Sequence, residues 1–331
     1  MRPTQEDVAR RAGVSRALVS LVMRDAPNVS PTRRRTVLRA ADELGYRPNA
    51  SARSLASKEV RTFGVLIHDV TNPYFGLVYG SVAAAAERAG YDLLVAPGTR
   101  SPEREVSLVR TLLEHQIAGL VLLSPMMRTA DLQRLSGTVP CVIIGSDTSV
   151  AGVDAVTTDE VQAARLVVEH LVGLGHRDIA HVTGGPTRPA RDREAGYRAV
   201  MAEAGLEPRV VPGEFTPEGG REGGEGLMAL DPLPTAVMAA NDLTAVGVMG
   251  VLRARGVDVP GDVSVVGFDD SQIAALDLVG LTSVRQPVDA FGDAAVARLA
   301  ELVAETGGEA RTQHIPAELV IRSSTGPVRG A

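Results

Sequence analysis

The chain has 331 residues, of which 44% are hydrophobic and 22% charged, a balance that excludes a disordered or collagen-like polypeptide. Its length allows roughly two to three ordinary domains. The net charge of −6 is unevenly distributed, because residues 1–61 hold thirteen Arg and Lys against six Asp and Glu, while the remainder holds twenty-one against thirty-four. A basic head on an acidic body is typical of nucleic-acid binders, although a solvated basic head without a target would have the same composition.

Two short helices are predicted at the start of the chain. Thr4 and Asp7 form a capping pattern, and Gly13 ends the first helix. Ser15 then caps a second helix over residues 16–23. Its inward face is predicted to contain Val19, Val22 and Met23. Its outward face is predicted to contain Arg16, Ala17 and Ser20. Two short helices about a glycine turn predict a helix-turn-helix.

A third helix is predicted to open at Ser30 and Pro31 and to close at Gly45. Its apolar side is predicted to contain Val37, Leu38, Ala41 and Leu44, which would complete a three-helix core. The alanine-rich segment Asn49–Leu55 follows, capped by Asn49. A helix this short is marginal alone, so we expect it to form only when it is packed or bound, as a conditional hinge.

The head resembles the DNA-binding domain of the lactose and galactose repressor (LacI/GalR) family, and the resemblance extends over nearly the whole chain. The matching positions are Thr4, Asp7-Val8-Ala9, Ala12-Gly13-Val14-Ser15, Val19-Ser20 and Leu44-Gly45-Tyr46-Arg47-Pro48-Asn49-Ala50. Leu18 and Leu21 depart from the pattern, because many relatives carry a threonine and an arginine there. Contacts made at those two positions in relatives therefore cannot be transferred.

The resemblance implies a set of DNA-binding residues. They are Thr4, Ser15, Arg16, Ala17, Ser20, Asn28, Arg33, Asn49, Ala52 and Leu55. Arg16, Ala17 and Ser20 would face bases or phosphates, with Arg16 the best candidate for reading guanine. Asn28 and Arg33 would anchor the DNA backbone. Asn49, Ala52 and Leu55 would enter the minor groove, where Leu55 would act as an apolar wedge that kinks a central step.

From residue 62 onward, short apolar runs alternate with amphipathic segments. The predicted strands are Phe63–Ile67, Leu93–Val95, Leu120–Leu123, Val142–Ile144, Ile179–Val182, Val210–Phe215, Ala236–Met238, Val263–Val266 and Leu281–Val284. Their apolar character and the helices between them predict doubly wound α/β lobes with parallel sheets. A helix over Val288–Thr306 and a final strand over Gln313–Ile321 complete the pattern.

The predicted domains are a helix-turn-helix domain over 1–47, a hinge helix and linker over 48–61, and a two-lobed body over 62–331. The first lobe would comprise about 62–157 and 288–308, and the second about 158–287 and 309–326. By the family resemblance, the body has the two-lobed fold of periplasmic sugar-binding proteins, in which the chain passes between the lobes three times.

Polar residues follow several predicted strands and should gather at the carboxyl ends of the sheets, where open α/β folds bind ligands. They are His68-Asp69, Ser124, Ser146-Asp147, Thr183, Asn241-Asp242 and Asp269-Asp270. Some of them should instead cap the next helix, and we expect this of Asp242 and Asp270 in particular. Asn241 and Asp269 are the better ligand candidates.

By the resemblance, residues in and near this cleft match effector contacts of the family. They are His68, Asn72, Phe75, Arg100, Arg193, Phe215, Asn241, Asp269 and Gln286. A carboxylate can accept from two vicinal hydroxyls, an arginine donates a charged fork, and an amide does both, which suits a polyol. A purine or a sugar phosphate would use the same groups, so a sugar effector is what the family implies.

Other classes of protein fit less well. Gly224–Ala229 matches a dinucleotide pattern literally, but no clear strand leads into it, so we expect a glycine-rich helix start. The chain has one lysine, Lys58, which excludes a Walker loop, and no Gly-x-Ser-x-Gly elbow. Cys141 is the single cysteine and is predicted to be a buried thiol, and the six histidines lack ligand spacing. We expect no enzyme activity, metal or cofactor.

A binding-only sugar receptor would explain the body but not the basic head or the missing secretory signal. No apolar run approaches a membrane span, so we expect a cytoplasmic protein. The hypothesis is a homodimer that binds a palindromic operator in double-stranded DNA and is controlled by a sugar-like effector. The sign of control stays open, with relief of repression ranked first. No apolar heptads follow Ala310, which favours a dimer over a coiled-coil tetramer.

Overall fold

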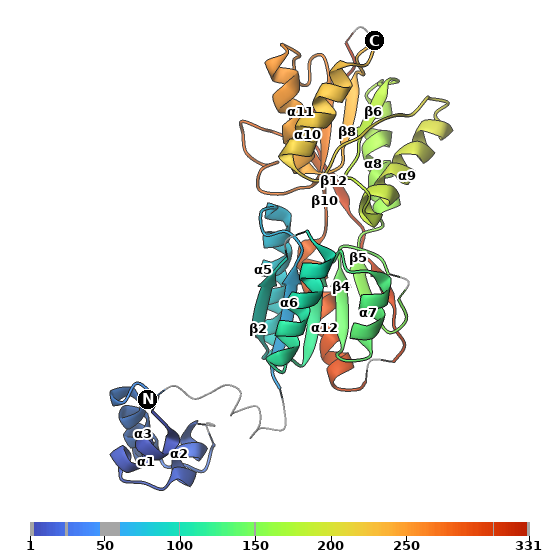
Figure 1. Cartoon of the computed structure of the whole chain (residues 1–331). Coiled ribbons are helices and arrows are strands. Elements are labelled where there is room, and N and C mark those ends of the chain that lie inside the picture. Colours follow the sequence, from blue (N-terminus) through green and yellow to red (C-terminus); the bar gives the residue numbers. More distant parts are fainter. Residues whose placement is uncertain are drawn as a thin grey trace. The chain divides into compact units, whose positions relative to one another are not determined.

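The computed structural model describes residues 3–23, 26–46, 60–98, 100–148, 150–306 and 308–329. The chain divides into two compact units, Met1–Val60 and Arg61–Ala331 (Figure 1). Each unit has buried apolar clusters of its own. The predicted hinge helix over Asn49–Leu55 lies outside the described residues.

The first unit contains the three predicted helices, α1 (Gln5–Ala12), α2 (Arg16–Met23) and α3 (Pro31–Glu43). Their core is built on Val8, Val19 and Val37, which are fully buried. Leu38 was predicted to face this core but is 49% exposed. Val37, Ala40 and Ala41 follow the three- and four-residue helical spacing and turn one face inward, so the position after Val37 points away from it.

The first lobe of the second unit is a six-stranded sheet in the order β11-β5-β4-β3-β1-β2, parallel throughout. Its strands are β1 (Thr62–Ile67), β2 (Asp92–Pro97), β3 (Gly119–Leu123), β4 (Cys141–Ile144), β5 (Asp154–Thr157) and β11 (Thr312–His314). Val121 packs with α5 (Pro73–Ala89) and α12 (Val288–Val303) on one face. Leu122 packs with α6 (Pro102–Glu114) and α7 (Thr129–Ser136) on the other.

The second lobe is a six-stranded sheet in the order β12-β10-β9-β8-β6-β7. Its strands are β6 (Ile179–Val182), β7 (Arg209–Val211), β8 (Ala236–Ala239), β9 (Ser264–Asp269), β10 (Thr282–Arg285) and β12 (Glu318–Val320). One face packs against α8 (Glu160–Gly173) and α9 (Arg188–Glu203). The other face packs against α10 (Pro217–Met228) and α11 (Asp242–Ala254). Both lobes thus have helices on each side of a sheet (Figure 1), and the predicted doubly wound architecture is confirmed.

The end of the chain differs from the prediction. The single strand expected over Gln313–Ile321 is two strands in different lobes, and β12 runs antiparallel to β10. Pro316 separates the two strands, and proline cannot donate to a strand ladder. The segment 309–314, assigned to the second lobe from sequence, therefore contributes β11 to the first. The chain passes between the lobes after β5, after β10 and after β11.

Three further predictions need correction. β5 was missed, because only Ala155 and Val156 in it are apolar. The strand expected over Val210–Phe215 ends at Val211. Gly224–Ala229 is not a helix start but covers the end of α10, where the buried Gly224 leaves room for Val251 of α11.

Within the described residues, no helix is long and apolar enough to cross a membrane. In the same part of the chain, no group of three or more His, Cys, Asp or Glu side chains is placed to hold a metal ion. Cys141 is buried, as predicted, and burial raises the pKa of its thiol to about 12.

Candidate functional site

The helix-turn-helix is fixed by its caps. Thr4 Oγ1 accepts a hydrogen bond from the Asp7 backbone N–H at 3.3 Å, and the Thr4 N–H donates to the Asp7 carboxylate at 2.9 Å. This reciprocal arrangement is the predicted capping box. Gly13 ends α1 with φ 66°, in the left-handed region that glycine adopts without strain. Ser15 Oγ accepts from the Leu18 N–H at 3.2 Å and starts α2.

The outward face of α2 carries the residues predicted to meet DNA. Arg16 and Ala17 are exposed and Ser20 is half-buried, whereas Val19 and Val22 are buried in the core. Asn28 and Arg33 are also exposed. The hydroxyl oxygens of Thr4 and Ser15 are held in place by the cap hydrogen bonds described above. Asn49, Ala52 and Leu55 lie outside the described residues.

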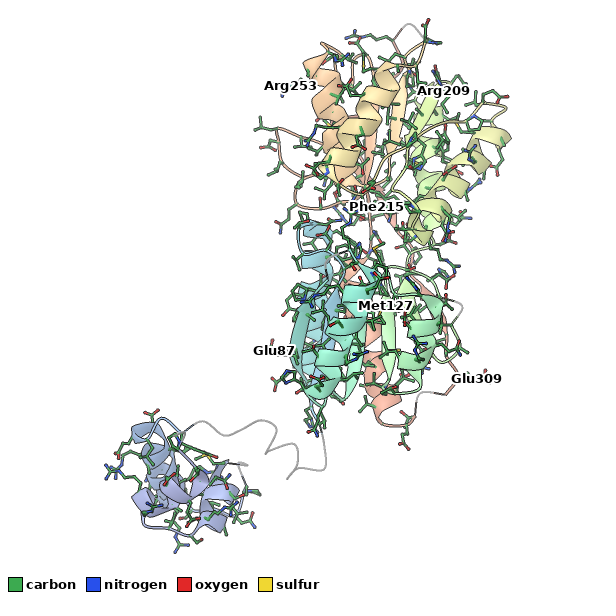
Figure 2. The ribbon with its side chains drawn as sticks, viewed as in Figure 1. Glu87, Met127, Arg209, Phe215, Arg253 and Glu309 are labelled. Carbon is green, nitrogen blue, oxygen red and sulfur yellow. The ribbon has the colours of Figure 1, made fainter. Side chains whose placement is uncertain are left out.

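A cavity of about 860 Å³ lies between the two lobes of the second unit. Residues of both lobes line it; Phe215 and Met127, two of these, are labelled in Figure 2. The volume falls in the range of small-molecule sites. Every residue predicted to contact an effector lines this cavity: His68, Asn72, Phe75, Arg100, Arg193, Phe215, Asn241, Asp269 and Gln286.

Arg193 is held by a buried network at the second-lobe end of the cavity. Its Nε donates to Glu160 Oε2 at 2.8 Å and its Nη1 to the Ala240 carbonyl at 2.6 Å, while its guanidinium carbon lies 3.5 Å from the centre of the Phe268 ring. Burial works to lower the pKa of Arg193, but the charges of Glu160 and Asp269 leave it raised. The predicted charged fork is therefore directed at Glu160, and the cavity receives only the remaining edge of the guanidinium.

Asp269 and Gln286 form a second buried polar pair. Gln286 Nε2 donates to Asp269 Oδ1 at 2.8 Å, and Tyr74 Oη from the first lobe donates to Gln286 Oε1 at 3.1 Å. Arg193 Nη2 lies 4.0 Å from Asp269 Oδ1. Burial raises the pKa of Asp269, and the Arg193 charge opposes this. These contacts connect the two lobes through one chain of hydrogen bonds.

The backbone at Asp269 is unusual. Asp269 has φ 111° and Asp270 has φ 46°, values that L-residues rarely adopt. Such strained positions cluster at ligand sites, where the surrounding structure holds them in place. The turn lets Asp269 line the cavity while Asp270 pairs with Arg285 and Arg322.

The predicted capping roles of Asp242 and Asp270 are wrong. Asn241 caps α11, because its side-chain oxygen accepts from the Thr244 N–H at 2.9 Å. Asp242 instead accepts from the Ser283 hydroxyl at 2.6 Å and from the Ser271 N–H at 2.7 Å, and burial raises its pKa to about 6. Asn241 thus both starts a helix and lines the cavity.

The first lobe supplies the facing wall. Asn72 caps α5 by accepting from the Tyr74 N–H at 3.0 Å. Phe75 lies edge-on to His68, whose Nδ1 is 3.4 Å from Oε1 of the buried Glu105. Further along, the lining becomes apolar, with Met126, Met127, Leu132, Ile143 and Val150. The first-lobe wall therefore combines polar side chains with an apolar patch, while Arg193 and Asp269 make the second-lobe end polar.

Two ion pairs bridge the lobes at the cavity rim. Arg100 Nη2 of the first lobe lies 3.2 Å from Glu214 Oε2 of the second, and Arg188 Nη2 of the second lies 3.0 Å from Asp147 Oδ2 of the first.

The sequence prediction did not include Tyr74, Glu160 or Arg188. Tyr74 follows the helix cap Asn72 and Glu160 follows the helix cap Asp159. A cap does not identify a partner such as Gln286, 212 residues after Tyr74, or Arg193, 33 residues after Glu160.

The comparisons with known proteins agree with both parts of the chain. Residues 4–49 match the bacterial regulatory proteins of the lacI family, and residues 168–325 match a periplasmic binding protein-like domain. Catabolite control protein A of Priestia megaterium is 33% identical over 98% of this chain and 100% of its own.

Two solved structures are similar over 98% of this chain and 100% of their own. The Lac repressor dimer bound to operator and the anti-inducer ONPF has a TM-score of 0.86 and 28% identity. The complex of the transcriptional regulator CelR with cellobiose has a TM-score of 0.74 and 31% identity. The capped helix-turn-helix, the two-lobed body and these full-length relatives together show that the chain belongs to the lacI family of bacterial regulatory proteins.

Proposed function

We propose that the protein is a DNA-binding transcriptional regulator, most simply a repressor, whose operator binding is controlled by a small polar effector held between the lobes of the body. One observation carries this proposal. A single chain combines an exposed helix-turn-helix face with an interlobe cavity, and the polar end of this cavity is built from buried, hydrogen-bonded residues that include the strained backbone of Asp269. The relatives named as repressors and regulators support it.

On the DNA side, the exposed edge of α2 would enter the major groove, with Arg16 donating to a guanine. Asn28 and Arg33 would contact phosphates, and the two capping hydroxyls of Thr4 and Ser15 would lie beside the DNA backbone. Asn49, Ala52 and Leu55 retain their proposed minor-groove role on the family pattern. Because the target is DNA, we place the protein in the cytoplasm.

On the effector side, the polar end of the cavity offers both donors and acceptors. Asp269 accepts, Arg193 donates and Gln286 does both, which is the complement of vicinal hydroxyl groups. The solved relatives bound to ONPF and cellobiose favour a sugar or sugar derivative. A purine or sugar phosphate remains the alternative, and the screen below separates the three classes.

The proposed mechanism needs no catalysis. A homodimer would hold two heads over the halves of a palindromic operator. An effector that bridges the lobes would favour one lobe arrangement over the other and so change the affinity for DNA, because coupling requires a difference in effector affinity between the two states. Relief of repression by the effector is our first choice of sign.

Two experiments test the proposal. Selection from a random duplex pool by the full-length protein should enrich a palindromic sequence. A thermal-shift screen against sugars, sugar phosphates and nucleobases should find one class that stabilises the body, by about 2.7 kcal/mol at a hundred times its Kd.

Asp269→Asn should remove the thermal shift but keep the duplex selection. Failure to enrich any duplex, or a hydride- or phosphoryl-transfer activity in the purified protein, would contradict the proposal.

A further inference from the structure

The outward face of α2 is divided into two edges. An α-helix turns about 100° per residue, so residues four apart lie on the same edge. Arg16 and Ser20 form a polar edge, and Ala17 and Leu21 form an apolar edge beside it. Both edges lie opposite Val19 and Val22, which are buried in the head.

Leu21 is an exposed residue of this face to which the proposed function assigns no contact. It is 38% exposed, whereas Leu18 on the same helix packs against the core cluster of the head. A leucine on the outward face contributes little to the fold of the head, and single exposed apolar residues are common on proteins. Here, however, the leucine lies one turn after Ala17 on the helix that the proposed function directs at DNA. Residues 1–61, which include this helix, hold thirteen basic against six acidic residues.

Resting on the proposed function, we propose that Leu21, together with Ala17, reads a thymine in each operator half-site through the C5-methyl group. That methyl is the apolar group on the major-groove edges of the base pairs. Arg16, on the neighbouring edge of the helix, takes a guanine close to this thymine. The other groove edges present polar N7, O6, N6 or N4 groups, which a leucine would leave without hydrogen-bond partners.

The opposing reading is that Leu21 packs against a protein, such as a second copy of the chain, and makes no base contact. A single chemical group, the C5-methyl of thymidine, distinguishes these two hypotheses. Deoxyuridine pairs as thymidine does and differs only by lacking the C5-methyl, so it removes the proposed contact without altering any hydrogen bond.

The first test replaces each thymidine of the selected operator by deoxyuridine, one symmetric pair of positions at a time. The affinity of the full-length protein is measured by fluorescence anisotropy at fixed salt. Loss of one buried methyl contact should weaken binding about fourfold per half-site at the position under Leu21 and have little effect elsewhere. If no thymidine position of the operator shows this loss of affinity, the inference is overturned.

The second test assigns the effect to the residue. Leu21→Ala should lose most of the preference for the thymidine operator over the deoxyuridine operator, and its affinity for the thymidine operator should fall toward that of the wild type for the deoxyuridine operator. Leu38→Ala is the matched control, because Leu38 is also an exposed head leucine, at 49%, but lies on α3. It should retain the full thymidine preference.

If Leu21→Ala keeps the preference, the inference is wrong although the protein still binds its operator. If no duplex is selected at all, the proposed function fails first and the inference fails with it. The two failures are therefore distinguishable.

Discussion

Replacing Glu160 by glutamine should destabilise the second lobe far more than replacing Glu203 by glutamine. Two arginine–glutamate pairs join α8 to α9. Arg193 contacts both carboxylate oxygens of Glu160, at 2.8 and 3.4 Å, and Arg165 contacts both oxygens of Glu203, at 2.8 and 2.7 Å. The pairs have similar geometry and differ mainly in burial.

The burial sets the magnitude. The side chains of Arg193 and Glu160 are 5% and 6% exposed, whereas those of Arg165 and Glu203 are 22% and 59% exposed. Removing one partner of a buried pair leaves an uncompensated charge and costs about 3–5 kcal/mol. Glutamine keeps one acceptor oxygen, so we expect about 3 kcal/mol for Glu160→Gln. An exposed pair contributes roughly 1 kcal/mol or less, which bounds the effect of Glu203→Gln.

The free energy of unfolding can be measured by urea titration with far-ultraviolet circular dichroism, since the chain contains no tryptophan. The double variant Glu160→Gln with Arg193→Met removes the unpaired cation and should recover part of the loss. Equal destabilisation by Glu160→Gln and Glu203→Gln would refute the reasoning, because burial would then not determine the strength of the pair.

Three other predictions concern buried groups of the body. Burial lowers the pKa of His181 from 6.5 to about 4. The stabilising contribution of the neutral imidazole is therefore present above pH 6.5 and is lost as the pH falls toward 4, by roughly 3 kcal/mol in all. His181→Gln should show a flatter dependence of the unfolding free energy on pH over this window, and an unchanged slope would exclude the effect. Cys141 should react with a thiol reagent roughly a thousandfold more slowly in the native than in the denatured protein, because its pKa is raised to about 12; similar rates in both states would contradict its burial. Gly196→Ala would direct a Cβ at the Val161 carbonyl oxygen where α9 crosses α8, and should lower the thermal midpoint by several degrees. Gly205→Ala is the comparison, because its Cβ would meet no atom within 4 Å and would cost only the strain of a positive φ. A wild-type midpoint for Gly196→Ala would show that the helices can separate freely.

Local signals in the sequence predicted much of the fold. The capping box at Thr4, the glycine stop at Gly13 and the apolar strand runs depend on residues a few positions apart, so the pattern contains the whole interaction. β5 and β12 were harder to predict, because such short strands are defined by the neighbours they pair with and not by an apolar run of their own.

The candidate site was predicted as a set of residues but not as a network. Asn241 was preferred to Asp242 as a ligand residue, yet their capping roles were exchanged, because both residue types favour a helix start. The direction of Arg193 depends on Glu160, thirty-three positions earlier, and Gln286 meets Tyr74 across the lobes. Partners so distant in sequence leave no local pattern.

The central claim is that a ligand in the interlobe cavity controls DNA binding by the head. The most direct measurement is the operator affinity of the full-length protein with and without a saturating effector from the thermal-shift screen, for the wild type, Asp269→Asn and the surface control Glu203→Gln. We predict that the effector changes the affinity of the wild type and of the control between about 5- and 150-fold and leaves that of Asp269→Asn unchanged. An effector that binds the wild type without altering its operator affinity, or that acts equally on Asp269→Asn, would contradict the account.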